Sequence, residues 1–272
     1  MTRTTLRDLA GEADAFLVDQ FGTLHDGSRP YPGALEALLL LQAAGKPVIL
    51  LSNSGKRAAP NEARLARLGF PRDSYTALIS SGEVAWQMLA CEEQGGACLL
   101  LSRGEDAGFL DGLPWRATDD PGAAELVLIA GSEADRRSLA GYDGVLQAAA
   151  ARGLPCLCTN PDRTMLVEGG TAPGAGRIAE RYAELGGAVT WIGKPHPRIY
   201  EAALARLGLL AGPRILAIGD SLEHDVAGAH RAGCRAALVL MGIAAGLDAG
   251  ELADEAQRWG AAPDFVLEDF GP

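Results

Sequence analysis

The chain has 272 residues, of which 48% are apolar and 22% are charged, and its formal net charge is -11 at pH 7. This composition is typical of a folded globular protein, and the length fits one large core or a core with an inserted domain. The negative charge argues against binding to the phosphate backbone of nucleic acid.

The sequence also argues against a membrane protein or a secreted one. It contains no uninterrupted run of about 20 apolar residues to span a bilayer, and its first residues are too polar for a signal peptide. The five cysteines are scattered without a paired Cys-x-x-Cys spacing, so we expect reduced thiols. A cytoplasmic protein without a membrane partner is the consistent interpretation.

Residues 1–14 are polar and predict a short helix or an irregular lead-in. The apolar segment 16–18 then predicts a buried strand that ends at Asp19 and runs into a Gly-Thr turn. Open α/β sheets place their ligand sites at the carboxyl ends of strands. Taken alone, Asp19 is equally a ligand-site carboxylate or one that only ends a strand.

The next segment predicts a helix, then a second strand that ends in a turn, and then another helix. Leucines at helical spacing predict a helix over 34–44, and 48–51 predicts a second buried strand. This strand ends in a hydroxyl-rich turn that starts at Ser52, and a helix is expected to about Leu68. The alternation predicts a parallel sheet whose loops share one edge, so that Ser52 would lie near Asp19. Taken alone, Ser52 fits better as a helix cap or a turn residue.

The regular alternation of buried strand, turn and helix is interrupted over 81–187. This interruption predicts an inserted α/β domain between the two parts of a core, 1–80 and 188–272. In this insert, the loop over 159–163 follows a predicted strand and contains polar side chains and one positive charge. It either reads a substrate or is a turn fixed by proline. Its strands are expected at 98–101, 126–130 and 156–158, and its helices at 83–92, 134–152 and 174–185.

After residue 187, the alternation of strands, turns and helices seen at the start of the chain resumes. Lys194 lies before a proline, which keeps it out of the helix expected over 198–207 and holds it at that helix's entry. A strand over 214–219 then delivers Asp220, and Asp225 lies about one turn further on. Carboxylates at this spacing suit Mg²⁺, although helix capping is the alternative for one of them. The remaining elements are strands over 236–240 and 265–267 and a helix over 249–259.

These groups together fit phosphoryl transfer. Mg²⁺, the Lys194 ammonium and the Ser52 hydroxyl would hold the phosphate, and Asp19 would attack phosphorus. The resulting aspartyl-phosphate would then be hydrolysed by water.

In this order, the residues resemble the haloacid dehalogenase-like phosphohydrolases over nearly the whole chain. The family's four motifs match, in turn, Asp19 to Thr23, Ser52, Lys194, and Gly219 to Asp225. The long interval between Ser52 and Lys194 resembles the large α/β cap of subfamily IIA, whose members include p-nitrophenyl, sugar and nucleotide phosphatases. The resemblance implies a Rossmann-like parallel sheet with helices on both faces and an inserted cap that reads the leaving group.

The resemblance also implies a set of site residues. Asp19, Asp220 and the backbone carbonyl of Phe21 would be Mg²⁺ ligands, and Asp225 would be a further ligand or would hold a water molecule. The expected substrate is a small phosphorylated metabolite, and a homodimer is one expected assembly because relatives form dimers. The residues expected to contact the substrate are Gly22, Thr23, Asn53, Ser54, Thr159, Asn160, Asp162 and Arg163.

One position departs from the family pattern. Phe21 stands where the family usually has a second aspartate that acts as general acid and then base, help typically worth about a hundredfold to ten-thousandfold in rate. A slow or specialised phosphatase is one hypothesis, with His25 or Asp26 as a replacement acid or a leaving group that needs little protonation. A Mg²⁺- and phosphate-binding sensor without turnover is the alternative. Cleavage of a carbon–phosphorus bond through a cap lysine is disfavoured because 81–187 contains no lysine.

Overall fold

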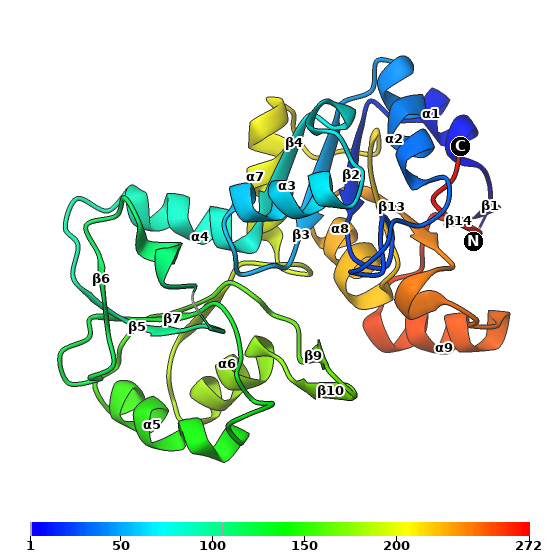
Figure 1. Ribbon diagram of the computed structural model, residues 1–272. Coiled ribbons are helices and arrows are strands. Elements are labelled where there is room, and N and C mark those ends of the chain that lie inside the picture. Colours follow the sequence, from blue (N-terminus) through cyan, green and yellow to red (C-terminus); the bar gives the residue numbers. More distant parts are fainter. Residues whose placement is uncertain (1, 105) are drawn as a thin grey trace. The chain divides into compact units, whose positions relative to one another are not determined.

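The computed structural model describes residues 2–104 and 106–272, and the chain divides into two compact units (Figure 1). The first unit comprises Met1–Ser52, Ala59–Ile79 and Lys194–Pro272, and the second comprises Asn53–Ala58 and Ser80–Gly193. The short segment Asn53–Ala58 therefore groups with the second unit, although the sequence pattern predicts it in the core.

A seven-stranded sheet forms the centre of the first unit, in the order β1-β14-β13-β12-β2-β3-β4. The strand pairs from β1 to β3 are parallel. β2 and β12 are buried along their whole length, as their continuous apolar sequences require. The strands are β1 (Thr2–Arg3), β2 (Ala15–Asp19), β3 (Val48–Ser52), β4 (Ala77–Ser80), β12 (Ile215–Gly219), β13 (Arg235–Val239) and β14 (Phe265–Leu267).

The helices of this unit begin and end where local signals place them. Pro197 starts α7, and α9 begins with a capping box formed by Asp248 and Glu251 and ends at Gly260 in the left-handed region. The segment after Asp220 is a π-helix, η4, rather than the start of an α-helix. The elements are α1 (Leu6–Glu12), α2 (Ala34–Ala43), α3 (Ala58–Arg67), η1 (Arg72–Ser74), α7 (Pro197–Leu207), η4 (Leu222–Ala227), α8 (Gly228–Arg231), η5 (Gly242–Ala244) and α9 (Ala249–Trp259).

The chain order of the strands reverses between β2 and β12. From β2 the chain proceeds to β3 and β4 on one side, whereas from β12 it proceeds to β13 and β14 on the other. Right-handed crossovers then place α2 and α3 on one face of the sheet and α8 and α9 on the opposite face. Such a reversal is the point at which doubly wound sheets bind ligands. The fold confirms the predicted α/β class with a parallel sheet and flanking helices.

The second unit has its own parallel sheet, in the order β11-β8-β7-β5-β6, and an antiparallel hairpin of β9 and β10. Ile178 and Tyr182 are fully buried in its core. The helix predicted over 134–152 is shorter because Ser138 and Gly141 are poor helix formers. The elements are α4 (Ser81–Ala90), β5 (Ala97–Leu101), η2 (Asp106–Leu110), β6 (Arg116–Thr118), β7 (Leu126–Ile129), η3 (Leu139–Tyr142), α5 (Asp143–Ala151), β8 (Cys156–Cys158), β9 (Thr164–Val167), β10 (Gly170–Pro173), α6 (Ala175–Glu184) and β11 (Val189–Trp191).

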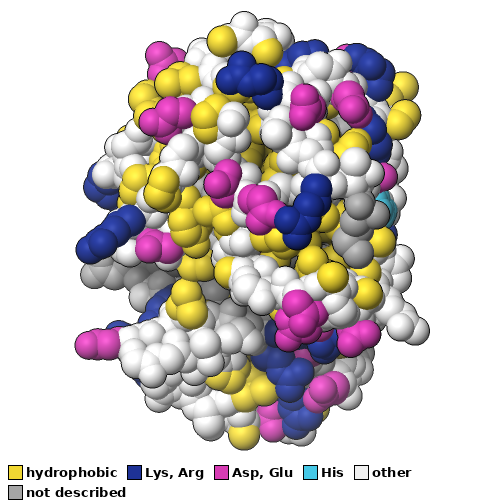
Figure 2. Space-filling model, turned by 90° about the vertical axis from the view of Figure 1, so that its right-hand side faces the viewer, with side chains coloured by type: hydrophobic (Ala, Val, Ile, Leu, Met, Phe, Trp, Pro, Cys, Tyr) yellow, Lys and Arg dark blue, Asp and Glu magenta, His cyan; other side chains and the backbone are white. Residues whose placement is uncertain are grey.

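The surface carries charges of both signs. On the face shown in Figure 2, Lys and Arg side chains are interspersed with Asp and Glu side chains and with apolar ones. Among the described residues, none of the helices combines the length and the apolar character that crossing a membrane requires.

Candidate active site

Four of the predicted site residues meet at the carboxyl edge of the first unit's sheet. Asp19 is the last residue of β2, and Asp220 directly follows the neighbouring strand β12, whose Ile218 pairs with Val18. Lys194 and Asp225 join them through the hydrogen bonds described next. The cluster thus lies where the strand order reverses.

Lys194 occupies the centre of this cluster. Its side chain is buried, with a residue exposure of only 3%. Its Nζ donates a hydrogen bond to Asp19 Oδ1 at 2.5 Å and another to Asp225 Oδ1 at 2.7 Å. One ammonium therefore fixes two carboxylates that come from different elements.

Asp225 is held at both of its carboxylate oxygens. Oδ1 accepts from Lys194, and Oδ2 accepts from the backbone N–H of Ser221 at 3.1 Å. The close approach of Gly219 requires a glycine, since a methyl group there would stand 2.0 Å from Asp225 Cγ. The π-helical turn carries Asp225 at this position, in agreement with the frequent occurrence of such turns at functional sites.

Asp220 is enclosed by backbone. Its Oδ2 accepts a hydrogen bond from the Ile243 N–H at 2.7 Å. Gly22 and Gly242 have positive φ values of 89° and 50°. A methyl group on either glycine would stand 1.9 Å from Asp220 Oδ2. Two loops therefore close on this carboxylate, and one of them brings the Phe21–Gly22 peptide next to it.

The cluster carries more negative than positive charge. Burial raises the pKa of Asp19 to about 7 against the opposing effect of Lys194. Burial, together with the charges of Asp19 and Asp225, raises the pKa of Asp220 to about 8. Burial alone would lower the pKa of Lys194, but Asp19 and Asp225 raise it. Lys194 therefore remains an ammonium, while the excess of carboxylates retains protons near neutral pH.

The chemistry of the cluster fits a hard divalent cation. Asp19, Asp220 and Asp225 each offer one carboxylate oxygen, and these atoms lie within 4.8 Å of one another. Oxygen-only ligand sets suit Mg²⁺. Three ionised carboxylates against one ammonium leave two negative charges, which a divalent cation would neutralise. Asp19, Asp220 and Asp225 are thus the residues that would hold it.

The loop after Asp19 is held by its own side chains. His25 is buried, its Nδ1 accepts from the Gly27 N–H at 3.0 Å, and burial lowers its pKa to about 4. Asp26 Oδ1 accepts hydrogen bonds from the N–H and hydroxyl of Ser28 and from the N–H of Arg29. Both residues suggested as replacement acids are therefore engaged in shaping this loop.

Phe21 stands at the start of the same loop and is 44% exposed. Its ring meets the His25 ring edge-on, with centroids 6.0 Å apart. Thr23, by contrast, is fully buried. The turn after Asp19 thus exposes an apolar ring and encloses the hydroxyl that was expected to contact the substrate.

Ser52 ends β3, the other neighbour of β2. Asp19 pairs with Leu51, so Ser52 lies one residue beyond Asp19 along the sheet edge. This register agrees with the expected proximity of Ser52 to Asp19.

Three of the predicted substrate residues of the second unit, Asn53, Asn160 and Asp162, are joined by hydrogen bonds. Asn53 Nδ2 donates to Asp162 Oδ1 at 2.7 Å, and Asn160 Oδ1 accepts from the Asp162 N–H at 3.0 Å. Thr159 is fully buried, and Arg163 forms an ion pair with Glu180 at 2.5 Å. Asn53 and Asp162 therefore tie two loops of this unit together, a contact that sequence spacing could not reveal.

Ser54 lies in the first of these loops. Its Oγ accepts a hydrogen bond from the Lys56 N–H at 3.3 Å, and its carbonyl accepts one from the Gly82 N–H. Ser54 thus helps to shape the turn that follows Ser52.

Sequence reasoning missed Gly242 and Ile243. They lie in the loop after β13, at the same sheet edge as Asp19 and Asp220. The available signal was a glycine three residues after a buried strand of a parallel sheet, at the edge where the backbone can approach a site closely.

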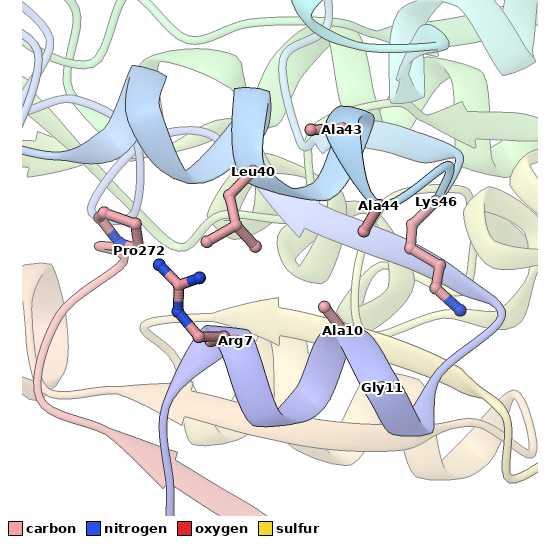
Figure 3. A pocket seen from close by; sticks show the side chains of 8 residues that line it. All are labelled: Arg7, Ala10, Gly11, Leu40, Ala43, Ala44, Lys46 and Pro272. Carbon is pink, nitrogen blue, oxygen red and sulfur yellow. The ribbon is translucent and has the colours of Figure 1, made fainter.

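A separate pocket lies toward the opposite edge of the sheet, since Ala44 and Lys46 precede β3 (Figure 3). Its volume is about 640 Å³, with Arg7 and Lys46 at opposite ends of an apolar floor. It contains none of the predicted site residues. Its lining residues are Arg7, Ala10, Gly11, Leu40, Ala43, Ala44, Lys46 and Pro272.

Comparison with known proteins gives consistent matches along the chain. Residues 16–114 match the family described as haloacid dehalogenase-like hydrolase, and residues 191–271 match a family described as HAD-hydrolase-like. Chronophin from Bos taurus is 34% identical over 286 residues, which cover 96% of this chain and 90% of that protein. The D-glycerol 3-phosphate phosphatase of Mycobacterium tuberculosis is 28% identical, over 90% of this chain and 67% of the relative.

Among solved structures, the p-nitrophenyl phosphatase from Archaeoglobus fulgidus is similar with a TM-score of 0.80 and 26% identity. The similarity covers 95% of this chain and 97% of that one. It therefore extends over both units.

Proposed function

This chain belongs to the haloacid dehalogenase-like hydrolases, and on that premise we propose that it is a Mg²⁺-dependent phosphatase of small phosphomonoesters that works through an aspartyl-phosphate on Asp19. Named relatives are phosphatases. The observation that carries the proposal is the single ammonium of Lys194 held between Asp19 and Asp225 beside a third carboxylate.

Each residue of the cluster has a distinct task in this proposal. The hydrogen bond from Lys194 fixes the orientation of the Asp19 carboxylate, so that the nucleophile is held before the substrate arrives. The ammonium also offsets the charge of an incoming phosphate. Ser52, one residue along the sheet edge, would donate its hydroxyl to a phosphate oxygen. Asp19 then attacks phosphorus, and water completes the hydrolysis of the acyl phosphate.

Asp19, Asp220, Asp225 and the Phe21 carbonyl are the proposed ligands of Mg²⁺. The bound cation would neutralise phosphate oxygens so that an anionic nucleophile can approach. The backbone around Asp220 supports this assignment. Gly22, Gly242 and the Ile243 N–H hold its carboxylate in one place, as the supporting residues of metal sites commonly do.

The second unit is the proposed substrate-selecting domain, by similarity to the family's cap. A sugar phosphate, a nucleotide or a related phosphorylated metabolite is the proposed class of substrate. If this assignment holds, replacing residues 80–193 by the corresponding unit of a relative changes the substrate preference and leaves the dependence on Asp19 intact.

The direct test uses purified protein, Mg²⁺ and p-nitrophenyl phosphate. We expect release of nitrophenol that stops on addition of EDTA and is absent in Asp19→Asn. The matched control is Asp14→Asn, because Asp14 precedes the same strand and pairs with Arg214 away from the cluster. Absence of turnover together with tight Mg²⁺-dependent binding of inorganic phosphate would instead favour a sensor.

A further inference from the structure

The pocket of Figure 3 lies between α1 and the end of α2, where small side chains line it. Ala10 and Gly11 contribute from α1, and Ala43 and Ala44 contribute from the end of α2. A methyl group on Gly11 would meet no atom within 4 Å. Side chains this small leave a space between the helices that larger ones would fill. The volume of about 640 Å³ lies within the range of about 300–1,000 Å³ that small-molecule sites occupy.

The charged residues that line this pocket are basic. Arg7 lies at one end and Lys46 at the other, with Leu40 between them (Figure 3). None of the described lining residues is acidic, although the whole chain has 35 acidic and 24 basic residues. The local charge is therefore opposite in sign to the net charge of the chain.

The two cations are not neutralised by acidic side chains. Within residues 2–104 and 106–272, the side chains of Arg7 and Lys46 form no hydrogen bond or ion pair. Acidic residues at the end of α1 are paired with other cations. Glu12 pairs with Arg235 at 3.3 Å, and Asp14 accepts two hydrogen bonds from Arg214. Both cations of the pocket therefore remain available to an anionic ligand.

A dicarboxylate fits this arrangement of charges. The planar guanidinium of Arg7 can donate two parallel hydrogen bonds to one carboxylate, and the ammonium of Lys46 attracts the other as a point charge. An aliphatic chain between the two carboxylates would lie along Leu40 and Ala10, and its removal from water would add to the affinity. The charges and the apolar floor thus select for the same kind of molecule.

We infer that the pocket between α1 and α2 is a binding site for aliphatic α,ω-dicarboxylates, with Arg7 and Lys46 each holding one carboxylate. The site is separate from the cluster around Asp19, and the inference does not depend on the proposed function. α1 leads into β2 and α2 leads into β3, so the ligand bridges two helices that precede neighbouring strands. It stabilises the folded chain because the unfolded chain has no such pocket.

The first experiment measures the binding of unbranched dicarboxylates, from succinate to sebacate, by titration calorimetry at pH 7.5. Metal-free protein is used so that no bound cation can attract the carboxylates. The affinity should rise by up to about fourfold for each added methylene group until both cations are reached. It should then fall, because a longer chain must fold to keep both contacts. The monocarboxylate of the best length should bind about two- to fivefold more weakly.

The second experiment places the ligand by mutation. Arg7→Met and Lys46→Met should each weaken binding of the best dicarboxylate about two- to fivefold, and the double variant should weaken it by about tenfold. Arg206→Met removes an exposed cation of α7 outside the pocket and should change nothing. Gly11→Leu should abolish measurable binding by occupying the pocket. Gly144→Leu is its matched control, since Gly144 also lies in a helix with no atom within 4 Å of the methyl position.

The opposite results would overturn the inference. Equal affinities of the wild type and the double variant would do so, as would equal binding of monocarboxylates and dicarboxylates of the same length. Absence of binding at millimolar concentrations of every dicarboxylate would also contradict it. Asp19→Asn should bind the best dicarboxylate as the wild type does, and an altered affinity would place the ligand at the acidic cluster instead. None of these results depends on turnover, so the phosphatase proposal stands or fails separately.

Discussion

Lys194 Nζ lies 2.5 Å from Asp19 Oδ1, although the two residues are 175 positions apart in sequence. The contact joins the end of β2 to the loop that precedes α7, and it is buried. Because the same ammonium also binds Asp225, its removal would leave three carboxylates without a compensating charge.

The first prediction concerns this charge balance. Lys194→Met should lower the free energy of unfolding in EDTA by about 3–5 kcal/mol, as the loss of one partner of a buried ion pair usually does. It should also reduce kcat/KM with Mg²⁺ by at least about a hundredfold. Urea unfolding and steady-state kinetics measure the two effects. Lys46→Met, the control, lies in the pocket of Figure 3 and should change stability by less than about 0.5 kcal/mol.

The second prediction concerns the pH dependence of cation binding. Because burial raises the pKa of Asp19 to about 7 and that of Asp220 to about 8, Mg²⁺ must displace protons from these carboxylates below about pH 8. The affinity should therefore rise with pH and level off above pH 8. Titration calorimetry at pH 6.5 in two buffers of different ionisation enthalpy should detect proton release. Equal affinities at pH 6.5 and pH 9 without proton release would contradict the assigned ligands.

The third prediction follows from the same pKa values and concerns stability. A carboxyl whose pKa is higher in the folded state stabilises at low pH, and this contribution is lost as pH rises from about 4 to the folded value. In EDTA, the free energy of unfolding should therefore fall between pH 5 and pH 8.

Asp220→Asn tests this loss directly. It should reduce the decline between pH 5 and pH 8 by on the order of 2 kcal/mol and abolish Mg²⁺ binding. Asp248→Asn is the matched control, since Asn caps a helix about as well as Asp and Asp248 is the cap of α9. A decline as steep in Asp220→Asn as in the wild type would assign the pH effect to other groups.

The fourth prediction uses two glycines with similar backbone and different surroundings. Gly242 and Gly246 have φ values of 50° and 80°, so alanine is strained at both by about 1–2 kcal/mol. Only at Gly242 would the methyl group meet Asp220, because no atom lies within 4 Å of the methyl position at Gly246. Gly242→Ala should weaken Mg²⁺ binding by at least about tenfold. Gly246→Ala should bind Mg²⁺ as the wild type does; equal losses in both variants would point to backbone strain alone.

The residues at the carboxyl edge of the sheet could be predicted from the sequence, but the loops that pack around them could not. Buried strands that end in Asp19 and precede Asp220 are visible as apolar runs, and parallel strands bring their carboxyl ends together. Lys194 was placed correctly at a helix entry because proline restricts the residue before it. These features depend on local patterns and on the rules of parallel sheets.

Other features depend on contacts that local patterns do not encode. The Ile243 N–H reaches Asp220 across the two neighbouring strands β12 and β13, and Asn53 pairs with Asp162 across 109 positions. The hairpin of β9 and β10 and the short strands β4, β6 and β11 were missed, whereas the equally short strands β7, β8 and β14 were predicted. These elements are defined by their hydrogen bonds to neighbouring strands rather than by their local sequence.

The measurement that tests the account most directly is acid quenching of the reaction within milliseconds, followed by peptide mass spectrometry. With Mg²⁺ and p-nitrophenyl phosphate, one phosphoryl group should appear on Asp19 during turnover and disappear when substrate is exhausted. Nitrophenol release by an Asp19→Asn variant at the wild-type rate, with no phosphoryl group on Asp19 of the wild type at any time, would contradict it.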